Sequence, residues 1–147
     1  MTNKKVLIVE DDADVRLGYR VLLRAQGYDT FFAADSISAI SEARKHLPDL
    51  MVLDLGLPAG DGFVVMERLQ AAPNVDLAGI PVIVVSGRDL RGNKERALAA
   101  GAKAFVQKPW DDDELLGQIA RLLGEPDAYG QLDSIPIWDA DETATPS

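Results

Sequence analysis

Short apolar runs alternate with amphipathic stretches along most of this chain. The runs that predict buried strands cover residues 5–10, 28–33, 50–54, 82–85 and 103–107. The stretches with helical spacing of apolar residues cover 13–26, 36–46, 62–72, 91–100 and 112–123. Short, uniformly apolar strands separated by helices predict a parallel sheet that is covered on both faces and has right-handed crossovers. The expected fold class is therefore α/β, a doubly wound (βα)5 fold with a five-stranded parallel sheet.

The second predicted helix carries both an apolar face and a stop signal. Pro48 disfavours helical backbone in the residue before it and so ends this helix. The face expected to turn inward is formed by Ile37, Ile40 and Ala43. Farther along, the segment 73–79 contains proline and glycine and is expected to be a loop.

Composition excludes several classes of site. The chain has 147 residues, enough for one domain with a sizeable core. It has no cysteine, which excludes disulfides, zinc–thiolate sites and a thiol nucleophile, and its single histidine, His46, excludes a histidine-rich metal site. No apolar run approaches the roughly 18 residues of a membrane span, and the first apolar run is too short for a signal peptide. We therefore expect a soluble cytoplasmic protein with no membrane partner.

Negative charge is concentrated at the carboxyl-terminal end. The net charge is −9, and the segment 125–147 holds six acidic residues and no lysine or arginine. Neither part of the chain has a basic stripe, so direct binding to nucleic acid is not expected. The expected organisation is a domain over residues 1–124 and an acidic, flexible tail over 125–147. Within that tail, Ile135-Pro136-Ile137-Trp138 is an apolar island, either untethered or docked on this domain or on a partner.

Polar residues stand where the predicted strands end. Glu10, Asp11 and Asp12 follow the first strand, Asp54 ends the third, and Ser86 and Lys108 follow the fourth and fifth. Because the carboxyl ends of parallel strands open on one edge of the sheet, these side chains should converge there. Each residue alone has a plainer interpretation: Asp54 as a turn residue, Asp11 or Asp12 as a helix cap, Ser86 in a turn and Lys108 in solvent.

The convergence of these groups predicts a particular chemistry. Two like charges 4 Å apart repel by about 4 kcal/mol at an effective dielectric constant of 20, so clustered carboxylates need a cation. Mg²⁺ suits a site that offers carboxylates, water and a substrate phosphate. Lys108 suits a phosphate oxygen and the Ser86 hydroxyl can donate a hydrogen bond. With Asp54 as a carboxylate nucleophile, these are the parts needed for phosphoryl transfer.

The same residues resemble the receiver domain of bacterial two-component response regulators, which has a flavodoxin-like fold, over about residues 4–124. The residues that carry the resemblance are Glu10-Asp11, Asp54, Leu57-Pro58, Asp61-Gly62, Ser86, Phe105 and Lys108-Pro109. The resemblance implies that Asp54 takes a phosphoryl group from a histidine kinase or a histidine phosphotransfer protein. It also implies an Mg²⁺ site in which Asp11 binds directly, Glu10 binds through water, and Asp54 and the carbonyl group of Gly56 complete the ligands.

Further roles follow from the resemblance. Ser86 and Lys108 match phosphate-binding positions, and Ser86 with Phe105 matches the pair that switches when the phosphoryl group arrives. Some positions vary the family pattern: Glu10 stands where Asp is common and Ser86 where Thr is frequent. The remaining variations are Gly56 and Arg88, at positions that tune phosphoryl lifetime, and Trp110, where Phe is usual.

The predicted function is that of a phosphorylation-controlled signalling module. Its partners would be the kinase or phosphotransfer protein, a downstream protein target and, in a homodimer, a second copy. At most it would catalyse its own phosphorylation and dephosphorylation, without turnover of a separate substrate. With no effector domain in 125–147, the chain is expected to be a stand-alone receiver or a piece of a longer regulator.

Two alternatives remain open at this point. A magnesium-dependent phosphatase or phosphotransferase of the haloacid-dehalogenase type also uses an aspartate at a strand end. That class needs a second aspartate two residues later, where this chain has Gly56. A pseudo-receiver that binds partners without phosphorylation is the other alternative, although the acids, the hydroxyl group and the lysine are all present.

Overall fold

The computed structural model describes residues 3–57, 61–87, 92–109 and 111–125. Its backbone forms two units, residues 1–109 and 110–147. Each unit is described by itself below. The predictions for Arg88, for Trp110 and for the tail beyond residue 125 lie outside the described residues.

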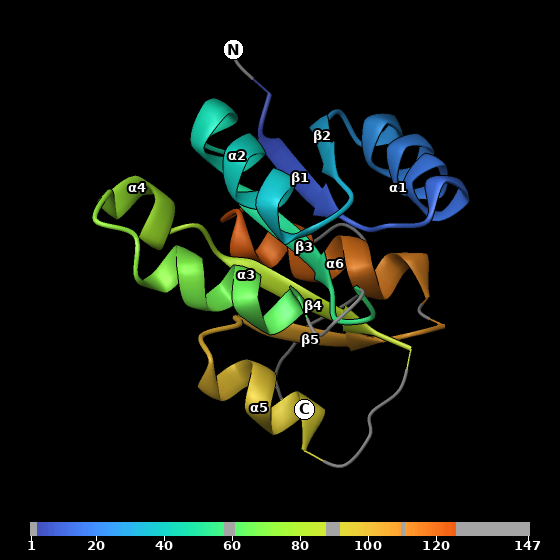
Figure 1. The fold of residues 1–147 in the computed structure, drawn as a ribbon. Coiled ribbons are helices and arrows are strands. Elements are labelled where there is room, and N and C mark those ends of the chain that lie inside the picture. Colours follow the sequence, from blue (N-terminus) through green and yellow to red (C-terminus); the bar gives the residue numbers. More distant parts are fainter. Residues whose placement is uncertain (1–2, 58–60, 88–91, 110, 126–147) are drawn as a thin grey trace, which may run out of the picture. The chain divides into compact units, whose positions relative to one another are not determined.

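The first unit contains a parallel sheet of five strands in the order β2-β1-β3-β4-β5 (Figure 1). The strands are β1 (Lys5–Val9), β2 (Asp29–Ala33), β3 (Leu50–Asp54), β4 (Val82–Ser86) and β5 (Ala104–Gln107). The chain crosses from β2 over β1 to β3, so that β3 lies in the middle of the sheet. This topology confirms the predicted α/β fold.

Helices connect the strands along the chain. Those of the first unit are α1 (Ala13–Ala25), α2 (Ser36–His46), α3 (Asp61–Gln70), α4 (Val75–Ala78) and α5 (Asn93–Ala99). The short helix α4 corrects the prediction of a loop over 73–79. Its first turn forms because the side chain of Asn74 accepts a hydrogen bond from the backbone N–H of Asp76 at 2.8 Å, which satisfies one otherwise unpaired amide.

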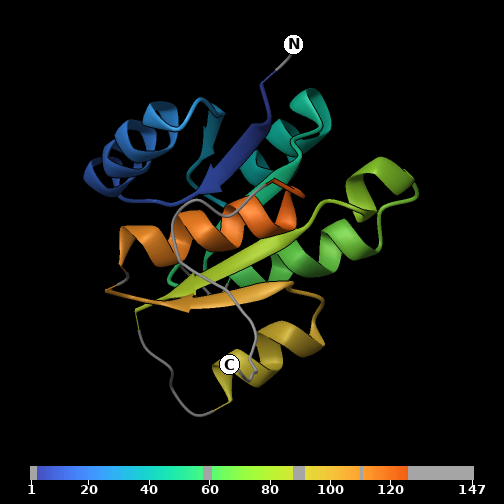
Figure 2. The same ribbon diagram turned by 180° about the vertical axis from the view of Figure 1, so that it is seen from behind.

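Helices of the first unit lie on both faces of the sheet, with α1 on one face and α2 and α3 on the other (Figures 1 and 2). The side chains that alternate toward α2, α3 and α5 form one apolar core, which includes Leu7, Met51, Leu53 and Val84. Both faces of β1, β3 and β4 are therefore covered, as their continuous apolar runs predict.

The inward face of α2 differs from the predicted one. Ala39 and Ala43 are buried, whereas Ile37 is 75% exposed. Ser36, Ala39 and Ala43 are the residues that face the sheet, because small side chains let the helix approach it closely. Ile37 therefore belongs to the outer surface, and only Ala43 of the predicted face is fully buried.

The second unit contains α6 (Asp112–Leu122), which agrees with the predicted helix over 112–123. The Asp111 side chain accepts a hydrogen bond from the backbone N–H of Asp113 at 2.9 Å and caps the helix. Three acidic residues in the first turn, Asp112, Asp113 and Glu114, complement the positive end of the helix dipole.

Candidate active site at the strand ends

The register of the sheet brings three charged residues to one face. Ile8 pairs with Val52, so Glu10 and Asp54, each two residues farther along, lie on the same side of neighbouring strands. Asp54 pairs with Val85, and Val85 pairs with Val106, which places Lys108 on that side as well. The two-residue period of the strands therefore produces the convergence that the sequence predicted for Glu10, Asp54 and Lys108.

Three carboxylates meet at this edge. Glu10, Asp11 and Asp54 each offer an oxygen atom, and these atoms lie within 4.8 Å of one another. Asp11 is exposed, whereas Glu10 and Asp54 are only 2% and 7% exposed. Two buried acids beside an exposed one form a site that is open to solvent on the side of Asp11.

Asp54 is held through both carboxylate oxygens. Oδ1 accepts a hydrogen bond from the backbone N–H of Gly56 at 2.7 Å, and Oδ2 accepts one from Nζ of Lys108 at 3.0 Å. A Cβ atom at position 56 would lie 3.2 Å from Oδ1 of Asp54, so glycine leaves room for this carboxylate. The Asp54 side chain is thus fixed in one orientation at the end of β3.

Glu10 is anchored by the turn that follows it. Oε2 accepts a hydrogen bond from the backbone N–H of Asp12 at 3.1 Å, and Oε1 lies 3.3 Å from Nζ of Lys108. The side chain of Asp12 caps α1 by accepting hydrogen bonds from the N–H groups of Asp14 and Val15. The side chain of Asp12 therefore caps α1, while its backbone N–H holds the carboxylate of Glu10. The carboxylates of Glu10 and Asp11 are the ones left for ligand binding.

Sequence reasoning missed Arg16 at this site. Nη1 of Arg16 donates a hydrogen bond to the backbone carbonyl oxygen of Glu10 at 2.8 Å. This contact reaches back from α1 and fixes the backbone that presents Glu10 and Asp11. Only the position of Arg16, one turn after the cap residue Asp12, could have suggested it, and that signal is weak because arginine is common on helix surfaces.

Burial and charge shift the pKa values of the site in different directions. Burial raises the pKa of Glu10 to about 7, and its hydrogen bond with Asp54 adds to the rise. Burial would also raise the pKa of Asp54, but hydrogen bonds with Glu10, Gly56 and Lys108 outweigh it and lower this pKa. For Lys108, burial lowers the pKa, and the carboxylates of Asp54 and Glu10 more than compensate and raise it. Asp54 is consequently the ionised acid, as a nucleophile must be.

Ser86 and Phe105 lie on the opposite side of the strands from Asp54. Val84 pairs with Phe105, and Ser86 is two residues beyond Val84, so the register gives Ser86 and Phe105 the same face. Ser86 is buried, and Phe105 is partly buried against the apolar core. The two residues predicted as a switch thus lie on the same face of the neighbouring strands β4 and β5.

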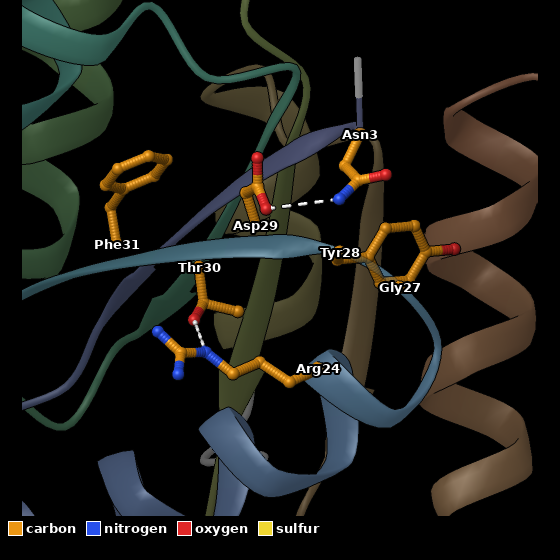
Figure 3. Close-up of a pocket in the computed structure, with 7 residues that line it drawn as sticks. All are labelled: Asn3, Arg24, Gly27, Tyr28, Asp29, Thr30 and Phe31. Carbon is orange, nitrogen blue, oxygen red and sulfur yellow. Dashed lines mark hydrogen bonds between the residues drawn. The ribbon is translucent and has the colours of Figure 1, made fainter. Parts of the chain in front are cut away.

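A cavity of about 400 Å³ lies at the amino end of β2, away from the acidic cluster (Figure 3). Nε of Arg24 donates a hydrogen bond to Oγ1 of Thr30 at 3.3 Å, and Nδ2 of Asn3 donates one to Oδ1 of Asp29 at 3.4 Å. These pairs tie α1 and the chain start to the edge strand. Their polar groups bond to one another, and the cavity gives no sign of chemistry.

The donor set of the acidic cluster fits a hard divalent cation. All the side-chain ligand atoms offered by Glu10, Asp11 and Asp54 are carboxylate oxygens, the type that Mg²⁺ prefers. Lys108 pairs with the carboxylates of both Glu10 and Asp54 and brings one positive charge to a cluster of three carboxyl groups, while Arg16 bonds to the backbone carbonyl of Glu10. The described part of the chain therefore leaves negative charge for a metal ion to neutralise.

Comparison with known proteins assigns the chain to a family. The sequence-family model for the response regulator receiver domain matches residues 6–120. The chain is thus a receiver domain of the two-component response regulators, which confirms the resemblance, and neither the phosphatase nor the pseudo-receiver alternative is favoured.

Curated relatives include both long and short proteins. The transcriptional regulatory protein KdpE of Mycobacterium tuberculosis is 32% identical over 92% of this chain and 58% of its own length. The polar-differentiation response regulator DivK of Brucella anthropi is 34% identical over 83% of this chain and 98% of its own length. The chain therefore spans little more than half of KdpE but nearly all of DivK.

Solved structures agree with the fold. A response regulator of Chloroflexus aurantiacus superimposes with a TM-score of 0.77 at 27% identity, over 84% of this chain and 100% of the other. The receiver domain of the sensor histidine kinase PA1611 of Pseudomonas aeruginosa was solved with a magnesium ion in its active-site cleft. It superimposes with a TM-score of 0.75 at 27% identity, over 84% of this chain and 100% of the other.

In the described part of the present chain, none of the helices has the length and apolar character required to cross a membrane.

Proposed function

We propose that this receiver domain accepts a phosphoryl group on Asp54 and passes the signal on through protein contacts. The observation that carries the proposal is the ion pair of 3.0 Å between Asp54 and Lys108, beside three acids whose oxygens lie within 4.8 Å of one another. In the transfer, a carboxylate oxygen of Asp54 forms a bond to phosphorus. The bond between phosphorus and the donor's imidazole nitrogen breaks, its electron pair stays on that nitrogen, and a proton from solvent neutralises it.

The chain's own residues prepare this step. Gly56 N–H and Lys108 hold the two oxygens of Asp54, so the nucleophile is oriented before the donor arrives. Glu10, Asp11, Asp54 and the carbonyl group of Gly56 would hold Mg²⁺, which when bound neutralises the acids and the charge on the incoming phosphoryl oxygens. Lys108 then adds a positive charge from the side of β5, and Ser86 would supply a hydroxyl donor from β4 after turning toward the phosphoryl group.

The phosphoryl donor in this proposal is a histidine kinase or a histidine phosphotransfer protein. Helix α1 begins directly after Asp12, beside the acids, and its outer side carries Leu17 and Val21 one turn apart. These side chains are 56% and 65% exposed. An apolar patch next to the mouth of the site suits a protein donor, because a donor histidine must be held within reach of Asp54.

The output in this proposal is a change in shape near β4 and β5. Ser86 would turn toward the phosphoryl group, and Phe105 would follow it inward, shifting the surface of α5 and β5 toward a state that binds a downstream protein or a second copy. Helix α5 is joined to α3 by the guanidinium group of Arg96, which lies 3.8 Å above the ring of Phe63. Cytoplasmic location and a domain boundary near residue 124 stay predictions from the sequence.

The test is the intact mass of the protein after incubation with acetyl phosphate, with and without Mg²⁺. We expect one added phosphoryl group that requires Mg²⁺, is removed by hydroxylamine and is absent from Asp54→Asn. Asp76→Asn, an equally conservative change at an exposed acid on α4, is the matched control and should be phosphorylated normally. Phosphorylation of Asp54→Asn to the same extent would refute the assignment of the acceptor.

A further inference from the structure

A cavity of about 330 Å³ is lined by residues of α2, α3 and α4 and of the segment that joins α3 to α4. Its apolar floor includes Ile40, Leu69 and Leu77, and Arg44 and Arg68 are among its lining residues. This volume falls within the range of roughly 300–1,000 Å³ that is usual for ligand clefts. The three helices lie next to one another in both views of the fold (Figures 1 and 2).

The two arginines of this cavity carry uncompensated positive charge. Among the described residues, neither guanidinium group forms an ion pair or a hydrogen bond with another side chain, and none of the residues that line the cavity is acidic. The protein as a whole has a net charge of −9. A positive cavity in an acidic protein favours an anionic ligand, and guanidinium groups pair with carboxylates through two parallel hydrogen bonds.

Exposed apolar side chains flank the same helices. Ile37 on α2 is 75% exposed and Val75 on α4 is 79% exposed. Ile37, Ile40 and Arg44 follow the spacing of one helix face, three and then four residues apart. Exposed apolar side chains on the helices that line a cavity are typical of a protein-binding site.

We propose that this cavity binds a short acidic peptide segment of a partner protein. One aliphatic or aromatic side chain of the segment fills the apolar floor, and neighbouring carboxylates pair with Arg44 and Arg68. An inorganic anion would leave the apolar floor unused.

This surface is separate from the phosphorylation site. Arg44 and Arg68 lie in the last turns of α2 and α3. Helices that connect parallel strands run back along the sheet, so their carboxyl ends lie at the edge opposite to the strand ends that carry Asp54. A bound peptide would therefore leave Asp54 accessible, and the inference goes beyond the proposed phosphoryl transfer.

The experiment titrates the ¹⁵N-labelled full chain with the peptide Asp-Glu-Leu-Trp-Asp-Glu and follows amide shifts by NMR. We expect saturable shifts at Ile40, Ala72 and Leu77, on the floor of the cavity. A peptide with Asn and Gln in place of the acids should bind about tenfold more weakly, because the charge pairs are lost. The Asp54→Asn chain should bind as the unaltered chain does, so failure here is distinguishable from failure of the proposed function.

The matched variants test the role of the arginines. Arg44→Glu with Arg68→Glu should weaken binding by about tenfold or more, whereas Arg20→Glu with Lys4→Glu, the same charge change at exposed positions elsewhere, should leave it unchanged. Circular dichroism checks that each variant is folded. The proposal is overturned by absent shifts, by equal affinity for the uncharged peptide, or by indifference to charge reversal. Shifts of the same amides that depend on protein concentration without peptide would assign the cavity to a second copy and overturn the partner assignment.

Discussion

The Nζ atom of Lys108 lies 3.0 Å from Oδ2 of Asp54, and this ion pair joins the end of edge strand β5 to the middle strand β3 across β4. The same ammonium group lies 3.3 Å from Oε1 of Glu10, at the end of β1. One side chain thus compensates two buried acids and links three strands at their carboxyl ends.

Removing that charge should destabilise the fold. In Lys108→Met, Glu10 and Asp54 lose the ammonium group that they share. We expect the free energy of unfolding to fall by about 1–2 kcal/mol, because a charged hydrogen bond to a largely buried acid is lost while 27% of the Lys108 side chain is already exposed to solvent. Urea unfolding at pH 7 without Mg²⁺ measures the change. Lys103→Met, at an exposed position of the same segment, is the control and should stay within about 0.5 kcal/mol. An equal loss in both variants would mean that the ion pair does not stabilise the fold.

The raised pKa of Glu10 predicts how stability depends on pH without Mg²⁺. The folded chain holds a proton on Glu10 up to about pH 7, whereas the unfolded chain releases it near pH 4.5. The resulting stabilisation is fully present below pH 4.5 and is lost as the pH rises to 7. Asp54 has a lowered pKa and acts oppositely, with its contribution lost only as the pH falls below 3.8. Urea unfolding at pH 5 and pH 7 measures the slope, which Glu10→Gln should abolish.

The same proton should be released when Mg²⁺ binds. A cation at the carboxylates favours their ionised forms, so the apparent affinity for Mg²⁺ should rise between pH 5 and pH 7. Calorimetry in two buffers that differ in ionisation enthalpy counts the protons released. We expect close to one per ion at pH 6 for the unaltered chain and fewer for Glu10→Gln. No proton release at pH 6 would contradict the assignment of the raised pKa to Glu10.

The exposed apolar pair on α1 should matter for a protein donor and not for a small one. Leu17→Ser with Val21→Ser should slow transfer from a cognate histidine kinase about tenfold, because an apolar contact with the donor is lost. The rate with acetyl phosphate should not change, since neither side chain is part of the acidic cluster. Ile37→Ser, at an exposed position on α2, is the control. A parallel loss with acetyl phosphate would show that the double variant disturbs the site itself.

Two glycines in helices predict opposite changes in stability. A Cβ atom at Gly62 would lie 3.0 Å from Cδ2 and 3.1 Å from Cα of Leu55, so Gly62→Ala should cost about 1–3 kcal/mol by overpacking the turn after Asp54. A Cβ atom at Gly18, within α1, would meet nothing within 4 Å. Gly18→Ala should therefore stabilise the chain by about 0.5–1 kcal/mol through helix propensity. Thermal unfolding of both variants tests the pair, and destabilisation by Gly18→Ala would contradict it.

The sequence was sufficient to predict the sheet and the residues gathered at its edge. Apolar runs bounded by proline and glycine identified the strands, and parallel topology then brought Glu10, Asp54 and Lys108 together without any knowledge of distances. The prediction succeeded because the alternation of side chains along a strand is a property of the backbone and is independent of the detailed packing.

Details that depend on tertiary packing could not be predicted. Ile37 fits the periodic apolar pattern of α2, but Ala39 and Ala43 face the sheet and Ile37 faces solvent. The distance between the helix and the sheet decides how large a side chain fits between them, and periodicity does not give that distance. The single turn of α4 depends on the hydrogen bond by which Asn74 caps it. The proline and glycine in this segment predicted a loop instead. The contact from Arg16 to the carbonyl oxygen of Glu10 likewise requires a side-chain path that periodicity does not encode.

The place of β3 in the middle of the sheet has a consequence for the stability of the strand that carries the proposed phosphoryl acceptor. Strands at a sheet edge open in small fluctuations, while a strand paired on both sides exchanges its amide hydrogens only in the rarest, near-global openings. Asp54 therefore sits on a long-lived part of the molecule, and Lys108 follows the edge strand β5. Local opening of β5 would move the ammonium group of Lys108 away from Asp54 while β3 stays folded. The charge beside Asp54 would then change without unfolding of the strand that carries it.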